Sequence, residues 1–280
     1  MLDELENLKN SIFEGKKIIF GLIGNPGIKE YSFSKKFFTD FFKEKGYSNC
    51  TYLNFGTNHI SDLPKLFDFF KEEKDKFIFG GLNVTNPYKG AIKKYVTSLS
   101  PAAESIGAVN TLKIDKDGKL IGHNTDYIGF TESIKPFLNK GHKKALILGT
   151  GGASKAVAYA FAEMGIENTF VSRVPKNTTI LSYEQLSESV MNEYQIIVNC
   201  THLGTHPNED EKPNIPYSFI SNQHLLYDLI YNPGKTQFLA TGEKKGAAIK
   251  NGLEMLKLQA LESWNIWDFE QSEELKITNQ

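Results

Sequence analysis

The sequence predicts an α/β protein with two domains. Apolar segments of strand length alternate with amphipathic segments of helix length through the first half of the chain. In the second half, a glycine-rich turn joins a short apolar strand to a helix, and another strand follows. The length of 280 residues corresponds to two domains when about 150 residues are allowed for each. We therefore expect parallel or mixed sheets whose strands are connected by helices.

The composition excludes several classes of protein. The chain carries 32 Lys and Arg against 33 Asp and Glu, a net charge of −1, whereas a general nucleic-acid binder has a basic excess. A hydrophobic fraction of 40% supplies a sizeable core, and no apolar run approaches the roughly 18 residues of a membrane span. The two cysteines and the scattered histidines lack the spacing of a disulfide framework or a metal site. Because residues 1–10 do not resemble a secretory signal, we expect a cytoplasmic protein without nucleic-acid, membrane or metal partners.

Residue spacing predicts the elements of the first half. Segment 2–12, which includes Ile12, places four apolar side chains at helical spacing. The continuous apolar run at 17–24 indicates a buried strand, and four phenylalanines give segment 32–45 the apolar face of a helix. Pro87 favours a helix start directly after it. Helices are expected at 2–12, 32–45, 63–70 and 88–95, and strands at 17–24, 51–55 and 77–84.

A hairpin and a second α/β unit are expected further along the chain. Two short apolar runs flank the turn at 115–118, where Gly118 can take a positive φ. The basic segment 139–144 reads as a surface link, after which a new strand starts at Ala145. Strands are expected at 111–114, 120–122, 145–148, 168–172 and 196–199, and helices at 126–138, 155–164 and 253–269.

The turn after the strand at 145–148 has the features of a dinucleotide site. Glycines let the backbone approach a pyrophosphate, and the start of the next helix supplies free N–H groups with a partial positive charge. The alternative is a glycine-rich turn in an ordinary α/β domain, but the order strand, turn, helix, strand favours the dinucleotide site. The cofactor-binding residues predicted here are Gly149, Gly151, Gly152, Ala153 and Ser154.

Arg173 indicates which dinucleotide binds. It is the single arginine of the chain, and it follows the strand at 168–172, where an NAD site usually carries an Asp or Glu for the ribose 2′-hydroxyl. A planar guanidinium can clamp a 2′-phosphate, and Lys176 adds a second positive charge. The alternative is a solvated surface arginine. We favour NADP(H) over NAD, with Ser172, Arg173 and Lys176 in its site.

Two hydroxyls lie at the start of the helix expected at 32–45. Ser32 and Ser34 follow the loop at 24–27, and beside free helix N–H groups they are suited to hold a carboxylate. The alternative is that they only cap the helix.

Polar residues also follow the strand at 77–84. Asn83 and Thr85 are two positions apart and therefore point to the same face. They lie at the carboxyl end of the strand, where open α/β sheets bind ligands. Lys89 is expected one turn into the following helix, and the alternative is that it is one of many solvated lysines.

The predicted hairpin brings two further polar residues towards one end. Asn110 precedes its first strand and Asp126 follows its second. Asp126 can also serve as the N-cap of the next helix, and capping does not exclude a catalytic role.

Seven motifs together resemble the shikimate dehydrogenase family. The resemblance covers roughly residues 17–268, and the combination of NVTxPxK with a downstream NTD is specific. It implies an NADP-dependent enzyme that reversibly reduces 3-dehydroshikimate to shikimate, in the biosynthesis of chorismate and aromatic amino acids. The motifs are GNP with SFS at 24–34, NVTNPYK at 83–89, GAVNT at 107–111, GHNTD at 122–126, GTGGASK at 149–155, YDLIYNP at 227–233 and NGLEMLKLQA at 251–260.

The resemblance also implies how the domains are arranged. Residues 1–125 with 250–280 would form an N-terminal α/β substrate domain with a mostly parallel sheet, to which the C-terminal helix returns. Residues 126–249 would form a Rossmann-like NADP-binding domain. We expect a monomer or a homodimer that binds a small-molecule substrate.

The resemblance assigns roles residue by residue. The catalytic pair of the family matches Lys89 and Asp126, and a protonated lysine beside a ketone oxygen can stabilise developing charge and donate a proton. The two hydroxyls that hold the substrate carboxylate match Ser32 and Ser34. Further matches are Asn83, Thr85, Asn110, Tyr231 and Gln259 for the substrate, Asn199 and Thr201 for the cofactor, and Gly252 and Met255 beside the nicotinamide.

The sequence departs from the family at two places and leaves two alternatives open. Tyr31 stands where the family commonly has His, and the loop at 200–204 reads CTHLG. Cys200 is expected to be a small buried filler rather than a reactive thiol. The alternatives are a quinate/shikimate dehydrogenase of broader specificity and a non-catalytic NADP-binding regulatory module on the same fold. The presence of both Lys89 and Asp126 favours an enzyme.

Overall fold

The computed structural model describes residues 1–12, 15–29, 32–270 and 272–276, and Tyr31 lies outside them. The chain forms two compact units, one of Met1–Thr125 with Ala260–Gln280 and the other of Asp126–Gln259. The chain returns to the first unit at Ala260, whereas sequence analysis drew this return at residue 250. Within the described ranges, no helix is long and apolar enough to cross a membrane.

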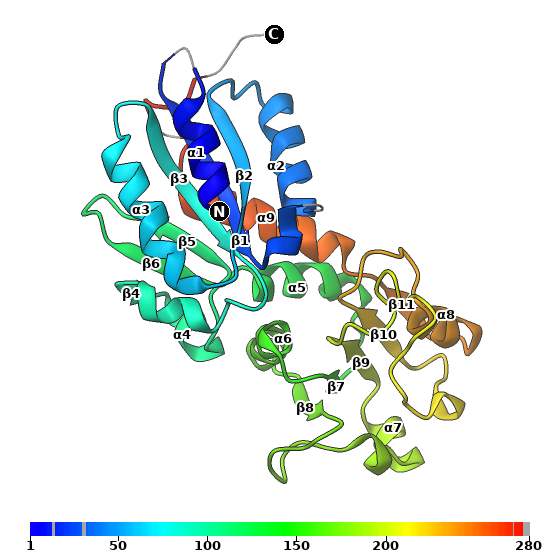
Figure 1. The fold of residues 1–280 in the computed structure, drawn as a ribbon. Coiled ribbons are helices and arrows are strands. Elements are labelled where there is room, and N and C mark those ends of the chain that lie inside the picture. Colours follow the sequence, from blue (N-terminus) through cyan, green and yellow to red (C-terminus); the bar gives the residue numbers. More distant parts are fainter. Residues whose placement is uncertain (13–14, 30–31, 271, 277–280) are drawn as a thin grey trace. The chain divides into compact units, whose positions relative to one another are not determined.

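A six-stranded sheet forms the centre of the first unit (Figure 1). Its strand order is β2-β1-β3-β5-β6-β4. β1 is parallel to β2 and β3, and β4 is parallel to β6, whereas β5 is antiparallel to both of its neighbours. The predicted α/β class is confirmed, with a sheet that is mixed but mostly parallel. The strands are β1 (Lys17–Gly24), β2 (Cys50–Gly56), β3 (Phe77–Val84), β4 (Ser98–Leu99), β5 (Thr111–Ile114) and β6 (Leu120–His123).

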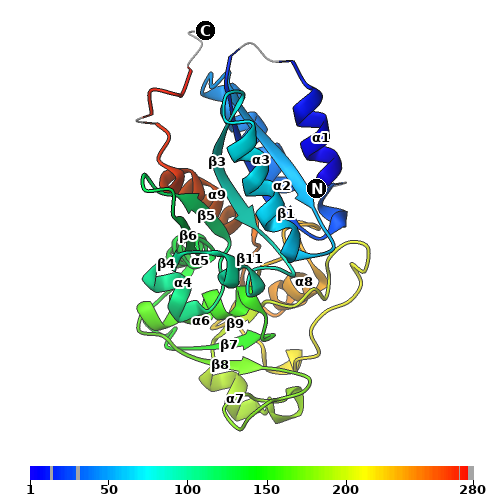
Figure 2. The same cartoon turned by 60° about the vertical axis from the view of Figure 1, so that its left-hand side comes forward.

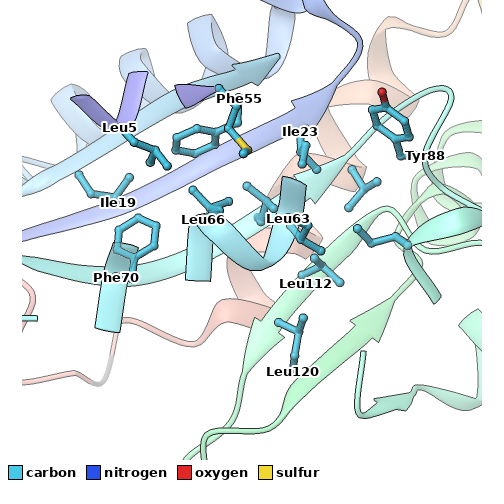
Figure 3. Packing of buried hydrophobic residues seen from close by; sticks show 14 of the residues in the cluster. Leu5, Ile19, Ile23, Phe55, Leu63, Leu66, Phe70, Tyr88, Leu112 and Leu120 are labelled. Carbon is cyan, nitrogen blue, oxygen red and sulfur yellow. The ribbon is translucent and has the colours of Figure 1, made fainter. Parts of the chain in front are cut away.

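Helices cover both faces of this sheet because β1 is apolar on both sides. Ile19 and Ile23 pack in one cluster with α1 and α3, and Phe20 packs in another with α2 and the end of α9. Figure 3 shows Leu63 and Leu66 of α3 in the same cluster as Ile19 and Ile23 of β1. The helical elements are α1 (Leu2–Asn10), η1 (Pro26–Lys29), α2 (Phe33–Glu44), η2 (Ile60–Asp62), α3 (Leu63–Glu72), η3 (Ala91–Tyr95) and α4 (Pro101–Ile106).

The second unit is built on a five-stranded parallel sheet of the Rossmann type. Its order is β11-β10-β9-β7-β8, and Figure 2 shows β7, β8 and β9 side by side. All of its pairings are parallel, so the sheet needs helical connections and cover on both faces. The strands are β7 (Lys144–Leu148), β8 (Glu167–Val171), β9 (Ile196–Asn199), β10 (Leu225–Asp228) and β11 (Ala248–Lys250).

Two apolar clusters cover the two faces of this sheet. Ile147 and Val198 face α5 and α6, where Phe130 and Phe161 pack. Their neighbours in the strands face the other side, where α8 contributes Phe238. The helical elements are α5 (Asp126–Ile134), η4 (Lys135–Phe137), α6 (Gly152–Glu163), η5 (Tyr183–Gln185), α7 (Glu188–Glu193), η6 (Tyr217–Phe219), α8 (Gln237–Lys244) and the part of α9 (Leu253–Trp267) before Ala260.

Three expectations from the sequence require correction. Residues 88–90 do not begin a helix, because the Tyr88 ring is buried and its hydroxyl donates to the Thr57 carbonyl at 2.8 Å. Lys89 therefore lies in a turn, and only the short η3 follows. The helix from Asp126 ends at Ile134 rather than at 138, since a proline at 136 disfavours helical backbone before it. Ile12 is 99% exposed and lies beyond the end of α1.

Candidate active site

The glycine turn between β7 and α6 is open where the helix begins. Gly149 has a φ of +107°, which L side chains rarely adopt, and a Cβ there would lie 3.4 Å from the carbonyl oxygen of Cys200. A Cβ added to Gly151 would meet no atom within 4 Å. Gly151 is the N-cap of α6, whose first N–H groups lack intrahelical partners. The turn therefore presents unblocked donors and the positive end of the helix dipole, which fits a phosphate group.

A cavity of about 660 Å³ lies against this turn. Its lining includes Gly149, Gly151, Arg173 and Thr201, all of which the sequence predicts to bind the cofactor. They come from the loops that follow β7, β8 and β9, at the carboxyl edge of the parallel sheet. Ligands bind at this edge in open α/β folds, and the volume falls within the roughly 300–1,000 Å³ of small-molecule sites.

Arg173 brings positive charge to this cavity. The side chain is exposed and lines the cavity together with Tyr183. Burial raises the pKa of Tyr183, and the nearby guanidinium partly offsets that rise. Lys212, which also lines the cavity, donates to the hydroxyl of Thr241 at 2.9 Å. A guanidinium in this position fits a phosphate on the nucleotide ribose.

Asn199 shapes the loop that contributes Thr201. Its Oδ1 accepts from the N–H of Thr201 at 3.0 Å and from the Thr201 hydroxyl at 2.7 Å. Its Nδ2 donates to Oδ1 of Asp228 at 3.0 Å. Because Asn199 has no exposed surface, it holds Thr201 in place instead of facing the cavity.

Other predicted cofactor residues also act on the shape of the site. The hydroxyl of Ser154 donates to the Gly151 carbonyl at 2.7 Å and is buried beneath the turn. Met255 packs in the cluster of α5 and α6, and a Cβ on Gly252 would collide with the Leu229 carbonyl. Of the described residues predicted to bind the cofactor, the cavity lining omits Gly152, Ala153, Ser154, Ser172, Lys176, Asn199, Gly252 and Met255.

Cys200 lines the same cavity without the properties of a nucleophile. Burial raises the pKa of its thiol well above the ordinary value, so the thiolate is disfavoured.

Across the residues that the structure describes, no cluster of three or more His, Cys, Asp or Glu could hold a metal ion.

In the first unit, a chain of hydrogen bonds runs from the start of α2 into the sheet. Tyr52 of β2 bonds to the side chain of Ser34, and its hydroxyl donates to Oδ1 of Asn83 at 2.8 Å. Burial raises the pKa of Tyr52 well above the ordinary value, partly offset by the bond to Ser34, so the phenol remains a donor. Ser32 caps α2 and accepts from the N–H of Lys35 at 3.1 Å. The structure thus gives Ser32 the capping role that sequence analysis left open.

Ser263 of α9 joins this chain to a second group of polar side chains. It has no exposed surface, and its Oγ lies 2.8 Å from Nδ2 of Asn83 and 2.9 Å from the hydroxyl of Thr111. Asn110 belongs to the same cluster, because its Oδ1 accepts from the hydroxyl of Thr111 at 3.1 Å and from the N–H of Thr125 at 2.7 Å. The last helix therefore fixes the amide of a residue that the sequence predicts to bind substrate.

Lys89 lies at the same carboxyl end of β3 as Asn83 and Thr85. Its carbonyl accepts from the N–H of Val109 at 2.8 Å, which ties the turn to the segment before Asn110. The structure thus brings four predicted site residues, Asn83, Thr85, Lys89 and Asn110, to one edge of the first unit.

Three of the residues predicted for catalysis or substrate binding belong to the second unit. Asp126 begins α5 and is 2% exposed. Tyr231 follows β10, and Gln259 is the last residue of this unit, within α9. Their roles in catalysis and substrate binding stay predictions.

Sequence analysis missed Tyr52, Ser263 and Asp228. Tyr52 and Ser263 lie among apolar residues of a strand and a helix, so they resemble ordinary core positions. Asp228 offered a signal, because it ends the apolar strand LLYD. A carboxylate buried at such a place is costly unless it is hydrogen-bonded, which points to polar partners nearby.

Comparisons with known proteins identify the family. The model of the shikimate dehydrogenase substrate binding domain matches residues 22–112. A shikimate dehydrogenase (NADP(+)) of Bacillus cereus is 32% identical over 269 residues, which cover 90% of this chain and 92% of that relative. The crystal structure of shikimate dehydrogenase from Aquifex aeolicus is similar with a TM-score of 0.78 at 32% identity, covering 92% of this chain and 94% of that chain. Shikimate 5-dehydrogenase from Thermus thermophilus in complex with NADP(H) and shikimate has a TM-score of 0.76 at 28% identity, covering 90% and 93%. The chain therefore belongs to the shikimate dehydrogenase family.

Proposed function

We propose that this protein is an NADP-dependent shikimate dehydrogenase that reversibly reduces 3-dehydroshikimate to shikimate. The reaction would serve the biosynthesis of chorismate and aromatic amino acids in the cytoplasm. The observation that carries the proposal is the cavity of the second unit, which combines an open glycine turn with Arg173. The relative from Thermus thermophilus, whose structure contains NADP(H) and shikimate, supports both the cofactor and the substrate.

NADP(H) fits the donors that this cavity offers. The turn at Gly149 and Gly151 and the N-terminus of α6 would hold the pyrophosphate. Arg173 would hold the 2′-phosphate, with Lys176 as a second charge. Thr201 would contact the cofactor from the loop that Asn199 supports. When bound, the nicotinamide supplies or accepts the hydride.

The substrate would be held by hydroxyl and amide groups. Ser32 and Ser34 would hold the carboxylate of shikimate, and the amides of Asn83 and Asn110 would contact its hydroxyls. Asn83 is supported from both sides, because its Oδ1 accepts from Tyr52 and its Nδ2 donates to Ser263. This support orients the amide before substrate arrives, which reduces the entropy lost on binding. Thr85, Tyr231 and Gln259 would complete the contacts.

Lys89 and Asp126 would move the proton. Hydride transfer to the ketone leaves negative charge on its oxygen, which the Lys89 ammonium would stabilise and then protonate. Asp126 would hold that ammonium in place and accept from the neighbouring hydroxyl. Oxidation of shikimate would run the same steps in reverse, with the Lys89 amine accepting the hydroxyl proton.

Nicotinamide absorbance tests the proposal directly. Purified protein is mixed with shikimate and either NADP⁺ or NAD⁺, and quinate serves as a second substrate. We expect reduction of NADP⁺ that depends on shikimate. Comparable turnover of quinate would favour the broader quinate/shikimate dehydrogenase. An absence of turnover in folded protein would favour the non-catalytic NADP-binding module and overturn the proposal.

A further inference from the structure

We propose that Asp228 is a positioning residue that sets the geometry of two functional loops at once. One loop follows β9 and carries Thr201, which is expected to bind the cofactor, and the other follows β10 and carries Tyr231, which is expected to bind the substrate. The inference rests on the proposed function, because that function gives the two loops their roles. Asp228 itself lines no part of the cofactor cavity and has no exposed surface.

The carboxylate of Asp228 accepts hydrogen bonds from three segments of the second unit. Its Oδ1 accepts from Nδ2 of Asn199 and from the N–H of Ile230, both at 3.0 Å. Its Oδ2 accepts from the hydroxyl of Thr236 at 2.6 Å. The donors lie at the end of β9, in the loop after β10 and at the N-cap of α8. One side chain therefore connects elements that are separate in the sequence.

The first arm of this network leads to the cofactor loop. With its Nδ2 held by Asp228, Asn199 directs its Oδ1 towards the N–H and the hydroxyl of Thr201. The Thr201 hydroxyl accepts in turn from the N–H of Leu203 at 3.2 Å. The conformation of the cavity wall at 201–203 therefore depends on the orientation of the Asn199 amide. A shift of about 1 Å in such a positioning element can change rates substantially.

The second arm leads to the segment that contains Tyr231. Asp228 accepts from Ile230, the residue directly before Tyr231, and from Thr236, which ends the segment. The Thr236 hydroxyl also caps α8 by accepting from the N–H of Leu239 at 3.4 Å. The loop is thus held near both ends by the two oxygens of one carboxylate.

A contribution to stability does not explain this carboxylate. Burial, the largest cause, raises the pKa of Asp228 to about 6, although its three hydrogen bonds oppose the rise. Among the described groups with a shifted pKa, Asp228 raises the pKa of the Cys200 thiol and of the Tyr217 phenol, and burial keeps both groups in their neutral forms. Among the residues that the structure describes, none of the groups that lower the pKa of Asp228 is a cation, so the charge of the ionised carboxylate is unbalanced and costs stability. What the network requires is the geometry of the carboxylate, whose two oxygens accept from three donors.

The test compares Asp228→Ala and Asp228→Asn with a matched control. Tyr227→Phe removes a buried hydrogen bond from the adjacent residue of β10, between the Tyr227 hydroxyl and Ser133 of α5 at 2.6 Å, and neither of these two hydroxyls belongs to the two loops. The readouts are the Kd of NADP⁺ by calorimetry, the KM of shikimate, the melting temperature, and the hydrogen exchange of the amides at 200–204 and 229–236.

Asp228→Ala should weaken NADP⁺ binding and raise the KM of shikimate, each about tenfold, and should accelerate exchange in both loops. Asp228→Asn keeps a carbonyl oxygen for Ile230 and Asn199 and should restore both constants to within about threefold. Tyr227→Phe should lower the melting temperature and leave both constants unchanged. If Asp228→Ala loses only thermal stability, as the control does, Asp228 is merely structural and the proposal is overturned.

Asn199→Ala provides a second test if Asp228→Ala does not fold, because it cuts only the first arm. It should weaken NADP⁺ binding about fivefold and leave the KM of shikimate unchanged. The proposal would be overturned if Asn199→Ala changed the Kd of NADP⁺ and the KM of shikimate equally, or if it changed neither constant. Hydrogen exchange needs no ligand, so a failure of the proposed function, seen as absent NADP⁺ binding by wild-type protein, is distinguishable from a failure of the two-loop model.

Discussion

The hydroxyl of Tyr52 donates to Oδ1 of Asn83 at 2.8 Å, and this bond decides which end of the Asn83 amide faces the polar cluster. With the oxygen held, Nδ2 is directed to Ser263 at 2.8 Å and to the hydroxyl of Thr111 at 3.1 Å. A phenol with a raised pKa stays protonated, so this hydrogen bond persists across the physiological pH range. Tyr52 therefore orients a residue that the proposed function places against the substrate.

We expect Tyr52→Phe to raise the KM of shikimate several-fold and to lower the unfolding free energy by about 1–3 kcal/mol. The substitution keeps the ring but leaves a half-buried amide oxygen without its donor. Steady-state kinetics and thermal unfolding measure the two effects. Tyr47→Phe is the matched control, because its hydroxyl lies 3.4 Å from Glu270 in the same unit. An unchanged KM in Tyr52→Phe would show that the orientation of Asn83 does not affect substrate binding.

Replacing Lys89 by Ala should lower kcat by about 10²–10⁴ with little change in the KM of shikimate. The physical reason is loss of the group that stabilises and protonates the developing oxyanion. Steady-state rates with NADPH and 3-dehydroshikimate give both constants. Lys94→Ala, an exposed lysine of η3, should behave like the wild type. A defect confined to KM would instead identify Lys89 as a binding residue.

Arg173→Ala should weaken NADPH binding at least tenfold while leaving the weaker binding of NADH nearly unchanged. If the guanidinium binds the 2′-phosphate, it contacts a group that NADPH has and NADH lacks. Titration of each reduced cofactor by fluorescence provides the comparison, with NADH as the internal control. Equal losses for both cofactors would contradict a 2′-phosphate site at Arg173.

The buried Asp228 should make stability fall as pH rises. Its pKa is about 6 in the folded protein against the ordinary 3.8 of an unfolded chain, so between these values the folded state binds more protons than the unfolded state. Unfolding free energy therefore decreases across this window, by at most about 3 kcal/mol. Asp228→Asn removes this dependence, and its stability should exceed that of the wild type by a growing margin from pH 4 to pH 6. Denaturant titrations at each pH measure both stabilities. If the unfolding free energies of the wild type and of Asp228→Asn change in parallel with pH, the raised pKa of Asp228 is contradicted.

Local patterns predicted several elements correctly. β1 and β3 have the predicted bounds, because each is a continuous apolar run between charged or turn-forming residues. The glycine turn and Arg173 share one cavity, as expected from the order of strand, turn and helix. The helix predicted at 88–95 is wrong at residues 88–90, where long-range hydrogen bonds of Tyr88 and Lys89 hold a turn before the short η3.

The sequence by itself determined the α/β class, the glycine-rich turn and the polar motifs, since each depends on residues close together in the chain. Only the tertiary structure decided which of those residues line the cavity, as Thr201 does, and which support others, as Asn199 does. Asn199 meets Asp228 across 29 residues, and Asn83 meets Ser263 across 180 residues. A buried donor and its acceptor must be paired to avoid a desolvation cost, but the identity of the partner depends on packing, which local spacing does not encode.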